Sequence, residues 1–382
     1  MEDWRNGGFG LYIHWPFCQA KCPYCDFNSH VATQIDQKRW QSAYLAEIER
    51  SAALTPGRVL ETVFFGGGTP SLMDGSLVDA ILQKVRACWP MVNDPEITLE
   101  ANPGSVDAAR FLAFRDAGVN RLSLGMQALD DLSLRQLGRV HSVSDAMRAH
   151  ELARETFPRV SFDLIYSRQG QTLRDWQAEL TRALVLQPDH LSLYQLTIED
   201  GTVFGRRHAM GKLPGLPDDD LSADQYLLTQ ELCSAQGLAA YEVSNHARAG
   251  NEARHNLIYW RGGDYVGIGP GAHGRLTMAG QRWATETAKA PGQWIAAAES
   301  AAGALRREVL SAEDRGKEYL LMSLRLSEGT NLARYADLAG RMPDAKRLAD
   351  LAELGHVTVA DGRLRATASG RMLLNSVIGA LT

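Results

Sequence analysis

Short β-branched and aromatic runs alternate with longer amphipathic stretches through the first 200 residues of this 382-residue chain. This alternation is typical of βα units around a parallel sheet. The predicted strands are Leu11–Trp15, Thr62–Phe65, Glu96–Glu100, Asn120–Gly125, Arg159–Ile165 and His190–Leu196. The predicted helices are Ile35–Ala53, Ser76–Trp89, Val106–Ala117, Asp130–Leu137, Ser144–Thr156 and Leu173–Leu186. Six such units favour an α/β fold with a partial (β/α)6 TIM-type barrel. A doubly wound open sheet is the alternative, because periodicity alone does not separate the two.

Polar or glycine residues break the predicted strands close to where each one ends. The run from Gly66 to Pro70 follows the second strand, and Glu100 ends the third. Gln127 follows the fourth strand, and Asp163 interrupts the fifth. Each has an ordinary explanation on its own, as a turn, a strand-end carboxylate or a buried hydrogen-bond partner. Because parallel strands place their carboxyl ends at one edge, the recurrence favours one shared ligand site.

Three of the five cysteines, Cys18, Cys22 and Cys25, are clustered, with three and then two residues between them. This spacing offers three thiolates to one small centre, whereas four thiolates would complete the shell of a [4Fe–4S] cluster. Three thiolates therefore predict a cluster with one iron open to another ligand. A structural zinc site is the alternative, with His14 or His30 as a further ligand.

The composition limits the classes of partner. A net charge of −5 argues against a general electrostatic attraction to nucleic acid or anionic lipid. No apolar run approaches the length of a membrane span, and the first residues lack a signal-peptide pattern. We therefore expect a cytoplasmic protein whose cysteines stay reduced. Cys88 and Cys233 are expected to be small buried hydrophobes.

The alternation of predicted strands and helices ends at about residue 200, and we expect the chain to have three parts. These are a barrel core over residues 1–200, an extension over 201–305 and a C-terminal domain over 306–382. The extension contains a predicted helix near Ala223–Gln236 and a glycine-rich run over 261–274.

The end of the chain follows a helix–hairpin–helix pattern. Asp361-Gly362 separates the short predicted strands His356–Ala360 and Arg363–Ala366, which is a strong hairpin signal. Helices are predicted on either side, at Ala345–Leu354 and Ser369–Ile378. The pattern predicts an α+β winged-helix-like domain. Its mixed charge favours a docking or lid element over a DNA-reading one.

The cysteine motif and the following Gly66–Pro70 run resemble those of the radical S-adenosylmethionine (SAM) superfamily. In that superfamily the methionyl amine and carboxylate of SAM chelate the open iron. The resemblance implies that Cys18, Cys22 and Cys25 hold the cluster. Glycines allow close backbone approach, while carboxylates and arginine pair with the charged groups of SAM. The implied SAM-binding residues are Tyr12, Tyr24, Gly67, Gly68, Thr69, Glu100, Gln127, Arg139 and Asp163.

Within the superfamily, the chain resembles the coproporphyrinogen dehydrogenase-like branch over nearly its whole length. The matching segments are Tyr12–Cys18, Cys22–Ser29, Glu100–Gly104 and Tyr194–Thr197. Two features favour the heme-chaperone members of this branch over its dehydrogenases. The dehydrogenases have a further cysteine at the position of Phe27, and their N-terminal segment is longer.

The segment from His255 to Trp260 is similar to the HNxxYW heme-associated motif of the chaperone members. An imidazole can ligate heme iron, and neighbouring aromatic rings can pack on the porphyrin. The resemblance therefore implies that His255, Tyr259 and Trp260 bind heme, and that His255→Ala weakens heme binding. His246, His273 and Cys233 are weaker alternative ligands.

The sequence of one loop differs from that of many members of this branch. After Asp163–Tyr166, many relatives continue with Gly-Leu-Pro-Gly-Gln-Thr, whereas this chain has Ser167–Thr172. The departure leaves the local loop geometry open. The later run Gly267–Ala272 resembles a dinucleotide-binding loop only weakly, because proline interrupts it and no clear strand–helix frame surrounds it.

The resemblance implies a carrier that binds heme and delivers it to acceptor hemoproteins, including membrane-bound respiratory proteins. The implied cofactors and cargo are a [4Fe–4S] cluster, SAM and heme. A homodimer and a peripheral position at the inner face of the membrane are further expectations, and nucleic acid is not an expected partner. The alternatives are enzymes: an oxygen-independent coproporphyrinogen III dehydrogenase or a radical SAM methyltransferase.

Overall fold

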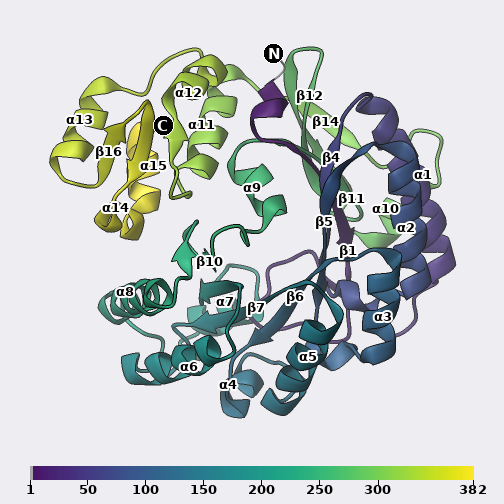
Figure 1. Cartoon of the computed structure of the whole chain (residues 1–382), viewed down its shortest axis with the longest axis horizontal. Helices are drawn as coiled ribbons and strands as arrows, with labels where there is room; N and C mark the ends of the chain where they lie inside the picture. The colour runs from purple at the N-terminus through teal and green to yellow at the C-terminus, as the bar shows by residue number, and fades with distance from the viewer. Residues whose placement is uncertain (1–2) are drawn as a thin grey trace.

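The computed structural model describes residues 3–382, whose largest element is a twisted sheet of twelve strands (Figure 1). Six of these strands are neighbours in chain order and pair in parallel. They are β1 (Phe9–Trp15), β4 (Leu60–Gly67), β5 (Met91–Ala101), β6 (Arg121–Gln127), β7 (Arg159–Tyr166) and β8 (His190–Gln195). All six overlap the predicted strands. Their order never reverses, as it would in a doubly wound sheet, so the partial barrel is confirmed.

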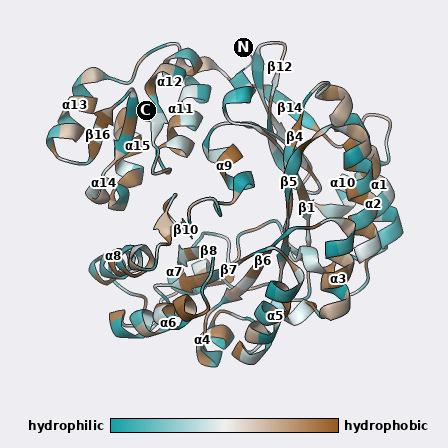
Figure 2. Ribbon diagram, viewed as in Figure 1, coloured by the Kyte–Doolittle hydropathy of each residue, from teal (hydrophilic) through white to brown (hydrophobic). Residues whose placement is uncertain are grey.

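The predicted helices of the barrel are also present and line the outer side of the curved sheet (Figure 1). They are α1 (Gln37–Leu54), α2 (Gly75–Cys88), α3 (Ala108–Ala117), α4 (Asp131–Gln136), α5 (Val143–Thr156) and α6 (Leu173–Val185). Figure 2 shows hydrophobic and hydrophilic stretches alternating along these helices, as expected for elements that bury one side. The main apolar core lies against them and includes Trp15, Phe65, Phe114 and Trp176.

Local sequence explains where several of these helices begin and end. The Thr172 side chain accepts a hydrogen bond from the Asp175 backbone, and the Asp175 side chain accepts one from Thr172 in return, which caps α6. Gly118 follows α3 with a φ of 113°, a left-handed conformation that favours glycine. The predicted helix stop at this glycine is confirmed.

Residues beyond 200 extend the sheet at both edges. At one edge, β10 (Asn245–Ala247) and β9 (Ala239–Ala240) add to β8 in antiparallel pairing. At the other edge, β11 (Asp264–Ile268) pairs in parallel with β1. It continues into an antiparallel meander of β12 (His273–Met278), β13 (Gln281–Glu286) and β14 (Arg306–Val309). The extension expected over 201–305 therefore shares the sheet of the barrel core.

The glycine-rich run, for which sequence analysis proposed no secondary structure, contains β11 and the start of β12. Glycine disfavours strands in general, but here β11 and β12 approach so closely that a side chain would not fit. A Cβ atom added at Gly267 would lie 2.0 Å from the carbonyl oxygen of His273. The glycine is needed for the contact between these strands.

The remaining elements before the C-terminal part are mostly short, apart from α8 (Asp219–Ala235). The others are η1 (Asp3–Asn6), β2 (Phe17–Cys18), β3 (His30–Val31), η2 (Pro70–Leu72), η3 (Pro103–Ser105), α7 (Val203–Ala209), α9 (Arg254–Trp260) and α10 (Pro291–Ala298). The helix predicted near Ala223–Gln236 corresponds to α8. In Figure 1, α9 lies on the inner side of the sheet, between it and the C-terminal part of the chain.

The C-terminal part has a separate apolar core that includes Leu320, Tyr335, Leu364 and Ile378. Its helices are α11 (Ala312–Ser323), α12 (Leu332–Ala339), α13 (Ala345–Glu353), α14 (Ala368–Met372) and α15 (Leu374–Leu381). Its sheet has the strand order β15 (Thr330–Asn331), β17 (Arg363–Ala366), β16 (Val357–Ala360). The predicted hairpin is confirmed. The predicted single helix Ser369–Ile378 is instead two helices that meet at Leu373.

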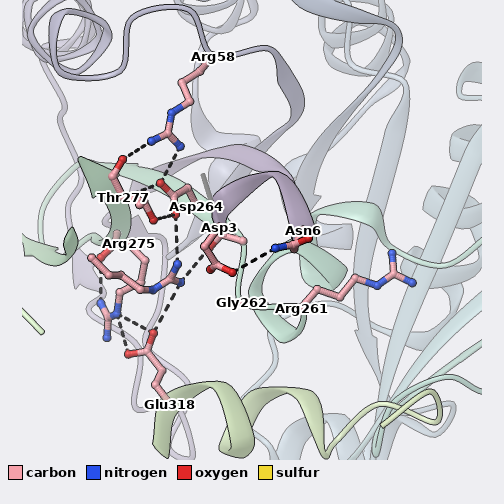
Figure 3. Close-up of polar contacts among 12 residues, drawn as sticks. Asp3, Asn6, Arg58, Arg261, Gly262, Asp264, Arg275, Thr277 and Glu318 are labelled. Atoms are coloured by element: carbon pink, nitrogen blue, oxygen red, sulfur yellow. Dashed lines mark hydrogen bonds and ion pairs between the residues drawn. The ribbon is translucent and has the colours of Figure 1, made fainter. Parts of the chain in front are cut away.

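An ion-pair network joins this C-terminal domain to the edge of the barrel (Figure 3). Asp264 of β11 is fully buried and pairs with Arg58 at 2.6 Å and with Arg282 at 3.2 Å. Glu318 of α11 pairs with Arg275 of β12 at 2.8 Å. Arg282 also lies 3.9 Å from Glu318, which links the two sets of pairs, so the network contributes to the contact between the domain and the sheet.

Among the described residues, no helix combines the length and apolar composition that a membrane span requires.

Candidate functional site

A cavity of about 360 Å³ opens at the carboxyl ends of the barrel strands. Its volume lies within the range of small-molecule sites. The cavity brings together the three clustered cysteines and all but one of the residues expected to bind SAM. These lining residues are Cys18, Cys22, Cys25, Tyr24, Gly67, Gly68, Thr69, Glu100, Gln127, Arg139 and Asp163. The expectation that strand-end residues share one site therefore agrees with their positions.

Cys18 ends β2, and the loop between β2 and β3 carries Cys22 and Cys25; backbone pairing of those two strands closes the loop. Each cysteine sulfur has a polar neighbour. Thr69 Oγ1 donates to Cys18 Sγ at 3.4 Å, and Arg139 Nη1 donates to Cys22 Sγ at 3.6 Å. The hydroxyl oxygen of Ser29 lies 4.0 Å from Cys25 Sγ. Hydrogen bonds to sulfur tune Fe–S clusters, so this environment fits thiolate ligands.

The cysteine loop fits a cluster better than a single metal ion. Within residues 3–382, no three His, Cys, Asp or Glu side chains converge on one ion position. In a cluster each thiolate ligates a different iron, so such convergence is not required. The histidines of the zinc alternative bond elsewhere. His14 Nε2 lies 2.9 Å from the Asn28 carbonyl oxygen, and His30 Nε2 lies 3.2 Å from Asn28 Oδ1.

Two carboxyl groups face each other in the cavity. Burial raises the pKa of Glu100 to about 8, and the neighbouring Asp163 adds to this rise. Burial also raises the pKa of Asp163 to about 6. The neighbouring Ser192 hydroxyl and the positive charges of Arg121 and Arg139 oppose this rise in the pKa. The Oδ1 atom of Asp163 is buried and has no hydrogen-bond partner among the described residues. Such an acceptor fits a ligand that supplies ammonium or hydroxyl donors.

The backbone around the carboxyl groups takes conformations that shape the cavity. Gly67 has a φ of 112° and donates its backbone N–H to Glu100 Oε2 at 3.2 Å. A Cβ atom there would lie 2.6 Å from the His14 ring. Gln127 is not glycine, yet it has a φ of 69° at a register shift between β6 and β7. Strain of this kind is concentrated at functional sites, where it aims a side chain.

Tyr12 is the one expected SAM residue that does not line the cavity. Its hydroxyl lies 3.0 Å from His14 Nδ1, and its ring packs beside Phe64 and His255. The residue lies in the middle of β1, whereas the cavity is at the carboxyl end of the strands. The Tyr12 side chain therefore lies deeper inside the barrel than the cavity does.

The HNxxYW-like segment forms α9 and lies near the opposite end of the strands. His255 is 1 % exposed, and both ring nitrogens have partners. Nδ1 lies 2.6 Å from Thr62 Oγ1, and Nε2 lies 2.6 Å from the Tyr259 hydroxyl. The His255 backbone N–H donates to Glu96 Oε1 at 3.0 Å. Burial lowers the pKa of this imidazole to about 3, so the ring is neutral and enclosed.

Trp260, the last residue of the motif, packs on the other side of α9, with its ring 5.9 Å from that of Tyr241. The structure therefore keeps His255 and Tyr259 in direct contact and turns Trp260 away from them. It also separates the three residues from the cysteine cavity, none of whose lining residues belongs to α9.

The loop over residues 167–172, whose sequence differs from that of many relatives, begins with a backbone conformation that favours glycine. Ser167 stands where many relatives have glycine, and its φ is 57°. Its hydroxyl donates to Gln225 Oε1 at 2.8 Å, which stabilises the strained residue. Arg168 Nη2 donates to Glu179 Oε2 at 2.6 Å. Asp163 still lines the cavity, so the substitutions do not displace it.

Sequence analysis missed a hydrogen-bond chain that begins beside the cavity. Ser192, opposite Asp163 in the sheet, donates to Asn245 Oδ1 at 3.0 Å. Asn245 Nδ2 donates to Glu242 Oε2 at 3.0 Å, and Arg325 Nε donates to Glu242 Oε1 at 2.8 Å. The chain thus extends to the C-terminal domain. No sequence pattern marks it, because its residues come from distant segments.

A partial parallel barrel with a three-cysteine loop beside a carboxylate-lined cavity defines a radical SAM protein. The model of the radical SAM superfamily matches residues 12–183, and that of the HemN C-terminal domain matches residues 310–373. The heme chaperone HemW of Escherichia coli strain K12 is 38 % identical over 96 % of this chain and 96 % of its own. The chain therefore belongs to the HemW family of radical SAM proteins.

Two further relatives extend this comparison. A mitochondrial protein of Bos taurus, radical S-adenosyl methionine domain-containing protein 1, is 37 % identical over 96 % of this chain and 86 % of its own. Coproporphyrinogen III oxidase (HemN) of Escherichia coli has a solved structure that superposes with a TM-score of 0.82 at 24 % identity. It covers 98 % of this chain and 90 % of that chain, and at this identity it shows the shared fold alone.

Proposed function

We propose that this protein is a heme chaperone, which binds heme and transfers it to acceptor hemoproteins. The observation that carries the proposal is the 38 % identity, across both whole chains, with a protein named a heme chaperone. Phe27 supports the choice. This side chain is 60 % exposed at the rim of the cavity, in the position where the dehydrogenases of the branch have a further cysteine.

The cavity residues fit a [4Fe–4S] cluster with SAM at its open iron. Cys18, Cys22 and Cys25 would each ligate an iron atom. Glu100 and Asp163 would accept hydrogen bonds from the ammonium and ribose hydroxyls of SAM. The bound cluster would supply one-electron chemistry to SAM, while Arg139 would hold the cluster loop and Gln127 would meet the polar groups of SAM.

Arg139 is placed for this role by two contacts. One end of its guanidinium donates to the Cys22 sulfur, and Nη2 donates to the Gly125 carbonyl at 3.0 Å. The side chain thus connects the cysteine loop to the end of β6.

In our proposal the protein acts in the cytoplasm, and its acceptors include membrane-bound respiratory hemoproteins. A homodimer and a peripheral position at the membrane belong to the same proposal.

The test is to reconstitute the protein anaerobically, titrate it with heme, and incubate a parallel sample with SAM and coproporphyrinogen III. We expect equimolar heme binding, transfer of heme to an apo-hemoprotein, and no conversion of the porphyrinogen. Decarboxylation of coproporphyrinogen III with consumption of SAM would establish the dehydrogenase alternative instead. Methylated product with loss of SAM would favour the methyltransferase alternative.

A further inference from the structure

Three polar side chains form a row across neighbouring strands, beginning at the cavity. Asp163 of β7 pairs in register with Ser192 of β8, and Ser192 pairs with Asn245 of β10. Paired residues on neighbouring strands point to the same face of a sheet, so their side chains lie next to one another. Asp163 lines the cavity, whereas Ser192 and Asn245 are buried behind it.

The Ser192 hydroxyl has a single proton to donate, and a possible acceptor lies on each side of it. On one side, the hydroxyl donates to Asn245 Oδ1 at 3.0 Å. On the other side is Asp163, whose Oδ1 atom is buried and has no hydrogen-bond partner among residues 3–382. The proton of Ser192 therefore serves Asn245, and the carboxyl group that faces the cavity is left without it.

Glu242 determines which end of the Asn245 amide faces Ser192. Asn245 Nδ2 donates to Glu242 Oε2 at 3.0 Å, and the same oxygen accepts the Ser244 backbone N–H at 3.0 Å. Because a carboxylate only accepts hydrogen bonds, the amide nitrogen has to face Glu242 and the amide oxygen has to face Ser192. If the amide turned over, its nitrogen would donate to the Ser192 oxygen, and the Ser192 proton would be free for Asp163.

The C-terminal domain holds Glu242 in place. Glu242 is fully buried, and Arg325 Nε donates to its Oε1 atom at 2.8 Å. Arg325 lies just after α11, and the neighbouring Leu326 packs in one apolar cluster with Tyr241. The Ser327 backbone N–H donates to the Tyr241 carbonyl at 3.0 Å, which fixes this segment against the barrel. Since a buried carboxylate without its counter-charge is strongly disfavoured, the contact with Arg325 stabilises Glu242 in this position.

We propose that Asn245 is a positioning residue of the SAM site, which takes the Ser192 proton and so keeps Asp163 free for the ligand. The inference rests on the proposed binding of SAM in this cavity, and it does not depend on the transfer of heme. A carboxyl oxygen that already accepts a hydrogen bond gains less from a further donor. Directing the Ser192 hydroxyl away from Asp163 therefore strengthens the bond from a hydroxyl or ammonium group of SAM.

A purely structural role is the alternative for these hydrogen bonds. In that role Asn245 joins β10 to β8 and to Glu242, and its loss lowers the stability of the protein. The two roles differ in one measurable respect. Only in the positioning role does the effect of Asn245 on SAM affinity depend on the presence of the Ser192 hydroxyl, which a double-mutant cycle detects.

The experiment measures SAM affinity by equilibrium dialysis in the full-length protein with its reconstituted cluster. Asn245→Leu replaces the amide by an apolar group of the same branched shape, so the Ser192 hydroxyl turns to Asp163. We expect this variant to bind SAM about fivefold to tenfold more weakly. Ser192→Ala should bind SAM at least as tightly as the unsubstituted protein. The double variant should regain most of the affinity that Asn245→Leu loses, because no hydroxyl remains to bond Asp163.

Tyr241→Phe is the matched control. It removes another buried hydrogen bond at this edge of the sheet, between the Tyr241 hydroxyl and His190 Nε2 at 2.7 Å. The control should lower the urea midpoint and leave SAM affinity unchanged, because neither Tyr241 nor His190 belongs to the row that ends at Asp163.

Two results would overturn the inference while the SAM site stands. One is a double variant that binds SAM as weakly as Asn245→Leu, and the other is an Asn245→Leu variant with full affinity. If Asn245→Leu folds poorly, Ser192→Ala alone still decides, since a loss of affinity there would mean that the Ser192 proton serves the ligand site. If the unsubstituted protein binds no SAM, the proposed cofactor site is wrong and the inference falls with it.

Discussion

Buried polar groups differ in their hydrogen bonding between the two ends of the barrel. At the carboxyl end, Asp163 Oδ1 has no hydrogen-bond partner among the described residues, and the neighbouring Asp163 adds to the raised pKa of Glu100. At the other end, both ring nitrogens of His255 are bonded, and its backbone bonds Glu96. The difference indicates where a ligand is needed. A buried acceptor without a donor destabilises the fold unless a bound molecule supplies the donor. A histidine whose two ring nitrogens are already hydrogen-bonded within the protein needs no such ligand.

The largest expected effect is at the cysteine loop. Cys18→Ser should abolish the [4Fe–4S] cluster, because two remaining thiolates cannot hold it as three do. The visible absorbance of the reconstituted protein and its iron and sulfide content measure the loss. Heme binding should largely persist, since neither His246 nor His255 lies at the cavity. A loss of both cofactors together would show that the two regions are not independent.

A second comparison uses one acidic residue from each end of the barrel. Asp163→Asn should weaken SAM binding by about tenfold to a hundredfold, because a charge-assisted hydrogen bond contributes about 1.5–3 kcal/mol. Equilibrium dialysis with labelled SAM measures this change. Glu96→Gln is the matched control. It lies at the far end, where Arg159 pairs with it at 3.1 Å, and it should leave SAM affinity unchanged while lowering stability.

His255→Ala should act mainly on stability. It leaves the hydroxyls of Thr62 and Tyr259 without their partner inside the barrel, at a cost of about 2–4 kcal/mol in the free energy of unfolding. Urea unfolding followed by circular dichroism measures this cost, and the cluster spectrum should stay intact. Tyr259→Phe removes only one of the two hydrogen bonds and should cost less. Unchanged stability in His255→Ala would contradict a structural role for this histidine.

The last comparison concerns pH. Asp163 and Glu100 have folded-state pKa values of about 6 and about 8, above their unfolded values of 3.8 and 4.5. The folded protein therefore binds more protons than the unfolded chain, and its stability falls as pH rises through this range. Asp163→Asn should remove the part of this decline between about pH 4 and pH 6, where the unfolded chain has lost the Asp163 proton and the folded protein still holds it. Urea midpoints of the cofactor-free protein between pH 4 and 8.5 measure it, and an identical decline in the variant would contradict the assignment.

Hydrophobic periodicity was enough to predict the six parallel strands, because each is a local run whose ends carry turn residues. It was not enough for β11, because its Gly267 is explained only by the close approach of His273 on β12, which periodicity does not record. The cysteines, Glu100 and Asp163 could be placed together because parallel strands share one edge. Tyr12 could not be placed correctly, since its depth in the barrel depends on packing with Phe64 and His255.

The pairing of β1 with β11 has a consequence for synthesis of the chain. The strand that leads into the cysteine loop has β4 on one side and β11 on the other, so it is complete only after Ile268 has been made. Until that moment a growing chain carries a bare strand edge next to its thiols, and such edges pair readily with other chains. A ribosome must therefore produce more than two-thirds of this protein before the support of its first motif is finished.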